Sequence, residues 1–204
     1  MPFPKLTPRT FPSIRELSGI SQRTMEEHYE LYKGYVAKTN EIQDKLGTVD
    51  RGSANQVFSD LRSLRVDLSF AIGGVKNHET YFGHLGGKGG APTGKIAELI
   101  GRDFPSVDGW LQDFKASGLA ARGWVWLAYD HDWNTLTTVV GDAQNTFPLW
   151  NATPVLALDV YEHAYWLDYG RARAKYIEAF FQNLDWGAVN ANLDKALAMQ
   201  AVAK

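Results

Sequence analysis

The chain contains no cysteine among its 204 residues. Disulfide bonds and thiolate metal sites are therefore excluded, and a bound metal would have to take its ligands from His, Asp, Glu or water. The formal net charge is only -2, which gives no general attraction to nucleic acid or to an anionic membrane surface. No apolar run approaches the ~20 residues that a membrane-spanning helix needs. We therefore expect neither a nucleic-acid partner nor a membrane.

The N-terminus also lacks the apolar segment of a signal peptide, because prolines interrupt residues 1–5. We therefore expect a cytoplasmic protein. Hydrophobic residues make up 45% of the chain and charged residues 22%, proportions typical of a globular protein. The length allows one compact unit or two small lobes that share a core.

Two long amphipathic helices are predicted in the N-terminal part. Apolar residues recur every three or four positions over residues 25–46, and His28 lies on this stripe. Gly47 suits the end of that helix. A second stripe runs over residues 61–85 and includes His78. Helices joined by a short link form an antiparallel hairpin, so we expect the two histidines to face each other.

A glycine-rich stretch at residues 86–94 separates this hairpin from the rest of the chain. It lacks both the preceding strand and the GK[ST] ending of a phosphate-binding loop, so we interpret it as a linker between lobes. We expect an N-terminal helical-hairpin domain at residues 1–90 and a C-terminal α+β domain at residues 91–204.

The C-terminal part combines helices with three strands. Short helices are predicted at residues 95–100 and 106–115, strands at 123–129, 135–140 and 154–160, and closing helices at about 162–183 and 186–201. The fold class is therefore α+β. We expect a long antiparallel α-hairpin followed by a lobe in which helices surround a three-stranded antiparallel sheet.

Residue types that bind metals gather where the third strand gives way to a helix. Asp159 and His163 are four positions apart at this junction, so both side chains can turn toward one point. With His28 and His78 they make three imidazoles and one carboxylate, a set that suits Fe, Mn or Zn rather than Ca or Mg. Taken singly, each buried histidine is more often a hydrogen-bonded core residue.

The other two histidines are not expected in this set. His131 lies in a predicted hairpin turn between two aspartates, where we expect it to be solvated. His84 points elsewhere on its helix, toward the glycine-rich linker. A set of three histidines and one aspartate that leaves one coordination position open would permit chemistry.

Residues 159–166 read DVYEHAYW and resemble the C-terminal ligand motif Asp-x-Trp-Glu-His-Ala-Tyr-Tyr of the iron/manganese superoxide dismutases. The resemblance covers nearly the whole chain. It includes the first-helix motif (HYELYKGYV at residues 28–36), the Asn-His of the second helix (residues 77–78) and the Gly-Trp-x-Trp-Leu strand beside the site (GWVWL at residues 123–127).

The resemblance implies that His28, His78, Asp159 and His163 hold one Fe or Mn ion per chain. It implies a superoxide dismutase, in which the metal alternates between two and three positive charges. One superoxide anion then leaves as oxygen and a second leaves as hydrogen peroxide. The protein must supply the protons and set the reduction potential.

The resemblance also implies roles for residues around the metal. Tyr35 is the gate of the substrate channel. Glu162 reaches across a twofold interface to a ligand histidine of the other subunit, so we expect a homodimer or a tetramer. The remaining residues expected beside the ligands or at the interface are Trp124, Tyr161 and Trp166.

The chain departs from the family pattern in its first helix. From His28 to Tyr35 there are seven steps, where the family usually has eight, and we interpret the extra residue as a local helix bulge that is missing here. The family also places a second histidine four residues after the first, hydrogen-bonded toward a tyrosine of the other subunit. Leu31-Tyr32 and Trp166 occupy these positions, so this relay is lost.

The glutamine that hydrogen-bonds the metal-bound solvent is also displaced. The iron-type position, before the second ligand, is Gly74, which has no side chain. The manganese-type position corresponds to Gln144, with one extra residue before the following Pro-Leu. We therefore expect Gln144 to serve, with His131 or Asn145 as the next candidates.

Two other functions stay open. A metal-dependent hydrolase could use the same ligands, but it would need a base beyond them and none is evident. A metal-binding superoxide dismutase-like protein with little or no turnover is favoured by the lost relay. Some surface cations could steer the superoxide anion, namely Lys33, Lys76, Lys88, Arg171 and Arg173. For each of them, ordinary exposed charge is the simpler interpretation.

Overall fold

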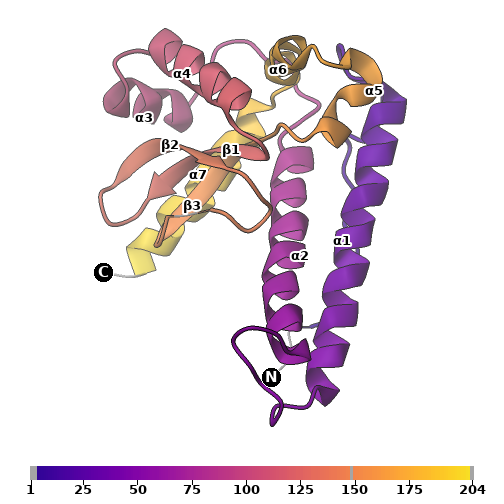
Figure 1. Ribbon diagram of the computed structural model, residues 1–204. Coiled ribbons are helices and arrows are strands. Elements are labelled where there is room, and N and C mark those ends of the chain that lie inside the picture. Colours follow the sequence, from indigo (N-terminus) through magenta and orange to yellow (C-terminus); the bar gives the residue numbers. More distant parts are fainter. Residues whose placement is uncertain (1–3, 148, 203–204) are drawn as a thin grey trace.

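The computed structural model describes residues 4–147 and 149–202 (Figure 1). Its helices are α1 (Gln22–Thr48), α2 (Asp60–Gly83), α3 (Lys95–Asp103), α4 (Val107–Ala120), α5 (Trp166–Tyr169), α6 (Arg173–Gln182) and α7 (Trp186–Val202), with a 3₁₀ turn η1 (Glu162–Ala164). The strands are β1 (Trp124–Asp130), β2 (Thr135–Gly141) and β3 (Ala152–Asp159). The predicted α+β class is confirmed. Within these residues, no helix is both long and apolar enough to cross a membrane.

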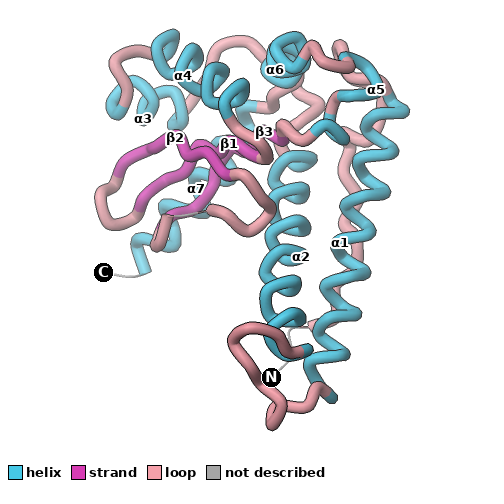
Figure 2. Tube along the Cα trace, in the orientation of Figure 1, coloured by secondary structure: helices cyan, strands magenta, loops and turns pink. Residues whose placement is uncertain are grey.

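The two long helices α1 and α2 stand side by side as an antiparallel hairpin, as predicted (Figures 1 and 2). Each begins at a serine, Ser21 or Ser59, whose side chain accepts a backbone N–H from the first turn. The buried stripe of α1 includes His28, and that of α2 includes His78. The hairpin therefore presents both imidazoles on its inner side.

The three strands form one antiparallel sheet in the order β2-β1-β3 (Figure 2). β1 is central and all seven of its residues are buried, whereas β3 lies at an edge. The β1–β3 register shifts between Leu127 and Ala128, opposite Pro154, which has no N–H to give to the ladder. α3 and α4 pack against β2, α7 packs against β3, and α2 also contacts β3. The end of β3 therefore lies next to the hairpin.

The hairpin joins the C-terminal part where α2 ends. Leu85 pairs with Leu184, and the backbone carbonyl of His84 accepts the Asp185 N–H at 2.8 Å. A Cβ at Gly87 would lie 2.3 Å from the Leu184 carbonyl oxygen, so only glycine permits this approach. The domain boundary expected at residue 90 stays a prediction.

The single closing helix predicted over residues 162–183 is wrong. This segment forms η1, α5 and α6 in succession. Gly170 adopts a left-handed conformation, with φ at +49°, and ends α5 after one turn. Apolar periodicity continues across these breaks, which is why the pattern alone did not reveal them.

Two smaller expectations also need correction. Gly47 does not end α1, which continues to Thr48 and is capped when the Val49 N–H bonds the Lys45 carbonyl at 3.0 Å. His131 is half-buried rather than solvated, because its Nε2 atom lies 2.8 Å from the Thr153 hydroxyl.

Candidate metal centre

Four separate elements bring three histidines and one aspartate together. His28 comes from α1, His78 from α2, Asp159 from the last position of β3 and His163 from η1. One possible ligand atom from each of the four lies within 4.8 Å of the others. The four residues singled out from the sequence are thus neighbours in space.

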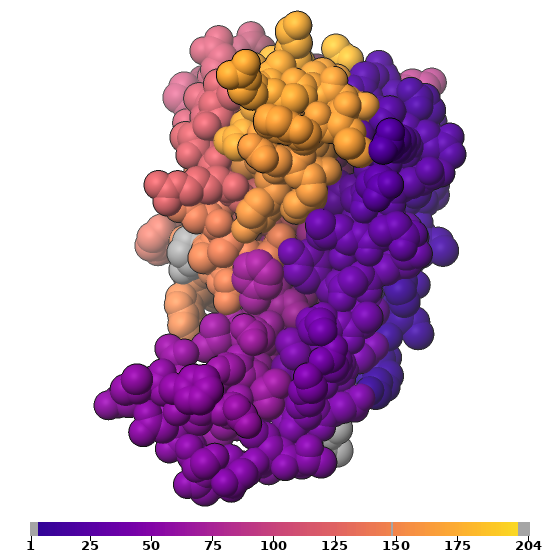
Figure 3. All heavy atoms as spheres, turned by 45° about the vertical axis from the view of Figure 1, so that its right-hand side comes forward, coloured from indigo at the N-terminus to yellow at the C-terminus, as the bar shows by residue number. Residues whose placement is uncertain are grey.

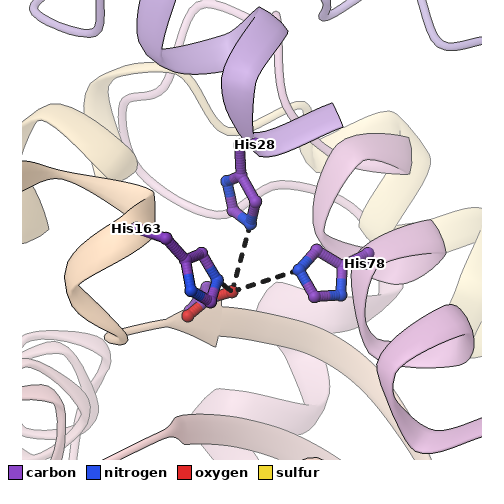
Figure 4. Close-up of side chains that lie close together, drawn as sticks. His28, His78 and His163 are labelled. Atoms are coloured by element: carbon purple, nitrogen blue, oxygen red, sulfur yellow. Dashed lines mark hydrogen bonds and ion pairs between the residues drawn. The ribbon is translucent and has the colours of Figure 1, made fainter. Parts of the chain in front are cut away.

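The ring nitrogens converge on one carboxylate oxygen of Asp159. The Nε2 atoms of His28, His163 and His78 lie 3.2, 3.1 and 3.6 Å from Oδ2. Figure 4 shows the three rings turned toward that oxygen from different sides. Ligand atoms bonded at about 2.1 Å to one ion lie about 3.0–3.6 Å apart for angles of about 90–120°. The three distances from the imidazole nitrogens to Asp159 therefore match those between ligands of one ion.

The tautomer of His78 favours metal binding. Its Nδ1 lies 2.6 Å from the Gly74 carbonyl and must donate there, which leaves a lone pair on Nε2. Within the described part of the chain this Nε2 atom has no hydrogen-bond partner, although it is buried. Burial, with the neighbouring His28, lowers the pKa of His78 to about 3. A neutral imidazole with its other nitrogen fixed by a carbonyl is the usual form of a metal ligand.

Asp159 supplies the negative charge of the cluster. Its Oδ1 accepts the Tyr161 N–H at 2.9 Å, so Oδ2 is the oxygen left for the imidazoles. Burial opposes ionisation, but His163 and His28 outweigh it and hold the pKa of Asp159 well below its usual range. A buried carboxylate among imidazoles needs a cation or protons to balance it.

A hydrogen-bonded wall closes one side of the cluster. The Gln144 side chain is buried, and its Oε1 accepts the Trp124 indole N–H at 3.0 Å. Its Nε2 donates to the Tyr35 hydroxyl at 3.3 Å, and Asn77 donates to the Gln144 backbone carbonyl at 3.0 Å. The Tyr35 ring lies 5.4 Å from the His78 ring. Gln144, Trp124 and Tyr35 therefore form one hydrogen-bonded group beside His78.

Two adjacent glycines of α2 make room for this wall. A Cβ at Gly74 would lie 2.6 Å from the Tyr35 ring, and a Cβ at Gly73 would lie 2.2 Å from the Gln144 carbonyl oxygen. Side chains here would push both groups away from His78. Gly74 is thus more than a missing glutamine, because its lack of a side chain is what allows Tyr35 to approach.

The helix around the first histidine is regular. α1 is α-helical throughout Gln22–Thr48, with no bulge between His28 and Tyr35. Tyr32 points away from the cluster: its hydroxyl accepts the Arg9 N–H at 2.9 Å and donates to Glu79 at 3.0 Å. Tyr32 therefore does not replace the histidine relay of the family.

One member of the cluster, His163, is partly exposed. The side chain of His163 is 25% exposed, whereas those of His28 and Asp159 are fully buried. Tyr161 stacks on the His163 ring at 5.3 Å, Glu162 is exposed, and Trp166 is 47% exposed. In Figure 3 the orange segment that carries η1 and α5 lies at the surface beside the indigo α1. Glu162 and Trp166 are therefore exposed on the segment that carries His163.

Of the cations considered for steering, two are engaged in other contacts. Lys33 forms an ion pair with Glu30, and Arg173 donates to the Ala121 carbonyl at 2.7 Å. Lys76, Lys88 and Arg171 are exposed. Exposure alone does not assign them a role at the cluster.

Two tyrosines beside the cluster were missed from the sequence. Tyr176 donates to the Asp159 backbone carbonyl at 2.7 Å, and the Tyr81 hydroxyl lies 3.1 Å from that of Tyr176. Tyr81 comes three residues after His78 on the same helix, which was an available signal. Tyr176 lies 17 residues beyond Asp159, and no spacing pointed to it.

Comparison with known proteins agrees with this geometry. A family profile described as "Iron/manganese superoxide dismutases, C-terminal domain" matches residues 92–192. "Superoxide dismutase [Fe]" of Aquifex pyrophilus is 42% identical over 199 residues, covering 95% of this chain and 93% of its own. "Superoxide dismutase [Fe]" of Cupriavidus metallidurans is 39% identical, covering 84% and 87%. "Superoxide dismutase [Mn] 2" of Haloferax volcanii is 34% identical, covering 88% and 90%. The chain belongs to the iron/manganese superoxide dismutase family.

Proposed function

We propose that this chain is a superoxide dismutase that holds one iron or manganese ion with His28, His78, Asp159 and His163. The observation that carries the proposal is the convergence of these four ligand groups, with atoms within 4.8 Å of one another. Similarity over most of the chain to relatives named superoxide dismutase supports the same activity. Three histidines and one aspartate suit a transition metal and leave room for substrate or solvent.

Bound iron or manganese would supply a one-electron couple, with which one superoxide is oxidised to oxygen and a second, with two protons, is reduced to hydrogen peroxide. Tyr35 is suited to hold a proton at this site. Burial raises the pKa of its hydroxyl, which therefore stays protonated at neutral pH. Because Gln144 donates to the Tyr35 oxygen, the Tyr35 hydrogen is free for another acceptor.

Gln144 is proposed as the partner of metal-bound solvent. Its side chain is oriented from two sides, by the Trp124 indole and by the Tyr35 hydroxyl. A group that hydrogen-bonds metal-bound solvent shifts the reduction potential, because the proton affinity of that solvent depends on the charge of the metal. We propose either iron or manganese as the metal, since relatives with both names match the chain.

We further propose a twofold homodimer, or a tetramer of two such dimers, with Glu162 at the twofold interface. The exposure of His163 supports this, because it is the only partly exposed member of the cluster and its chain neighbours Glu162 and Trp166 are exposed. A carboxylate from a second subunit could then bond the outer nitrogen of His163. The cytoplasmic location expected from the sequence stays a prediction.

A metal-binding relative with little turnover is the second candidate. Tyr32 bonds Glu79 rather than facing the cluster, and Trp166 stands where the family has a hydroxyl. Both changes remove hydrogen bonds around the substrate path. For the hydrolase alternative, the cluster formed by the described residues contains no carboxylate besides Asp159 that could act as a base.

A superoxide assay and metal analysis on the same sample would test the proposal. Protein loaded separately with iron and with manganese should contain about one ion per chain, and at least one form should dismutate superoxide far faster than the free ion. Full metal content without turnover would instead establish the second candidate. Failure to retain either metal would overturn the proposed centre itself.

A further inference from the structure

The backbone carbonyl of Asp159 is left outside the sheet. The Val160 N–H donates to the Gly123 carbonyl at 2.9 Å, flanking the Trp124–Asp159 pair. In an antiparallel ladder this makes Trp124 and Asp159 a non-hydrogen-bonded pair, whose own N–H and C=O groups point away from each other. β3 is an edge strand, so the Asp159 carbonyl points to a side where no described strand can receive it.

Tyr176 of α6 meets this carbonyl. Its hydroxyl donates to the Asp159 carbonyl at 2.7 Å and lies 3.1 Å from the Tyr81 hydroxyl. A phenol has a single hydrogen to donate, and that of Tyr176 is given to the carbonyl. Tyr81 must therefore be the donor in the second bond. The bonds run in one direction, from Tyr81 to Tyr176 to Asp159.

The two tyrosines are held rigidly in the core. Both are fully buried, and burial raises the pKa of each hydroxyl well above its ordinary value, so both remain donors at neutral pH. The Tyr81 ring lies 5.0 Å from the His28 ring, and the Tyr176 ring stacks on Tyr165 at 5.1 Å. Tyr165 lies two residues beyond His163 in the chain. The pair thus contacts α1, β3 and the segment that carries the fourth member of the cluster.

The oxygen atoms of Asp159 have different hydrogen-bond partners. Tyr161 holds Oδ1 through its backbone N–H, and Tyr176 holds the main-chain carbonyl. Oδ2 is then the oxygen left for the three imidazoles. A buried carbonyl without a donor would favour a shifted backbone, and the carboxylate would turn with it.

We propose that Tyr176, supported by Tyr81, is a positioning residue of the metal centre. It fixes the backbone of Asp159 so that Oδ2 meets the three imidazole nitrogens. It acts through Asp159 and touches neither substrate nor metal. This inference rests on the proposed metal site and says how that site is held in place.

The test compares Tyr176→Phe with Tyr169→Phe. Tyr169 is a suitable control because its ring also lies beside Tyr176, at 6.3 Å, and its hydroxyl also donates to a backbone carbonyl, but that of Gly19 rather than of a cluster residue. Both variants are loaded with manganese, and metal affinity is measured by competition with a chelator. The reduction potential is measured on the same samples. Loss of a hydrogen-bond partner that orients a ligand typically costs 10–100-fold in affinity, so Tyr176→Phe should bind manganese at least tenfold more weakly and show a shifted potential.

Tyr169→Phe should match the parent in affinity and potential. If Tyr176→Phe stays within twofold of the parent in affinity and keeps its potential, the proposal is overturned. Should Tyr176→Phe fail to fold, Tyr81→Phe carries the test, with an expected loss of at least threefold in affinity. No loss there would also overturn the proposal. A parent that binds both iron and manganese but dismutates superoxide with neither would refute the proposed function and leave the affinity comparison intact.

Discussion

The cluster has an inner side that is buried within the chain and an outer side that is partly exposed. On the inner side His28, His78 and Asp159 are fully buried, and Asp159 is bonded through Oδ1 and its carbonyl. On the outer side His163 is partly exposed and its neighbour Glu162 faces solvent. Three of the four proposed ligands therefore belong to the core of a single chain, whereas the fourth, His163, lies near its surface.

This difference separates two kinds of energetic role. Buried imidazoles fill space in the core, so replacing them should change both metal binding and folding stability. Groups on the exposed side fill little core volume, so their replacement should act on metal binding and subunit assembly while the fold persists. Variants on the two sides should therefore differ in their effect on folding stability.

The largest effect is expected when one ligand is removed from each side. His28→Ala and His163→Ala should both nearly abolish metal retention, because each deletes a ligand group. The metal-free forms of the two variants should differ in folding stability. His28→Ala leaves a cavity in the core and should lower the free energy of unfolding by about 2–4 kcal/mol. His163→Ala should lower it by less, because its side chain is partly exposed and leaves a smaller cavity.

Metal analysis and denaturant unfolding would measure the two effects. His131→Ala is the matched control, because His131 bonds Thr153 at the far end of the sheet and is not part of the cluster. It should retain a full metal ion. Full occupancy in His163→Ala would refute the ligand assignment, and equal destabilisation of the two ligand variants would remove the contrast between the sides.

His84 tests what burial does to an imidazole outside the cluster. Its Nε2 accepts the Ala157 N–H at 3.0 Å, so the buried ring must be neutral. Burial lowers its pKa from 6.5 to about 4. The unfolded chain binds a proton at higher pH than the folded chain does, so stability should fall as pH drops from about 6.5 to about 4, by about 3 kcal/mol in total.

Denaturant unfolding of the metal-free parent and of His84→Gln between pH 4 and pH 8 would measure this. Gln can still accept the Ala157 N–H but does not titrate. The variant should therefore lose less free energy of unfolding than the parent as the pH is lowered. Titration of the other histidines is common to both proteins and cancels in the comparison. Identical pH profiles would show that the buried state of His84 does not oppose protonation.

On the outer side, Glu162→Ala should weaken metal binding and dimerisation together. A carboxylate that bonds a ligand histidine typically contributes 10–100-fold in affinity or activity. Chelator competition and analytical ultracentrifugation would measure the two effects, with Asp113→Ala on the remote helix α4 as an exposed acidic control. A Glu162→Ala protein with unchanged metal affinity and unchanged association would contradict the proposed interface.

The ligand residues of the inner side could be predicted from the sequence, but the hydrogen bonds that hold them in place could not. The stripes of α1 and α2 placed His28 and His78 on facing surfaces, and the end of a buried strand placed Asp159. Periodicity reports which face is buried, and ligand types report the chemistry. The bond from Tyr176 to Asp159 was beyond reach, because it depends on which way an edge carbonyl points. The break at Gly170 was missed for a related reason, since a backbone conformation leaves no trace in hydrophobicity.

The smallest effect is expected at Gln144, which belongs to the inner side but holds no metal. Gln144→Ala removes the amide that bonds Trp124 and Tyr35, while all four proposed ligands remain. Metal content should therefore stay near one ion per chain. The reduction potential should shift and turnover should fall by about tenfold, because a bond oriented toward metal-bound solvent is lost. Asn145→Ala is the control, since its side chain bonds Ser69 on the outside of the same loop. Potentiometric titration and a superoxide assay would be run on both variants. A Gln144→Ala protein that matched the parent in potential and rate would show that the wall orients no solvent, and the inner side would then act through its ligands alone.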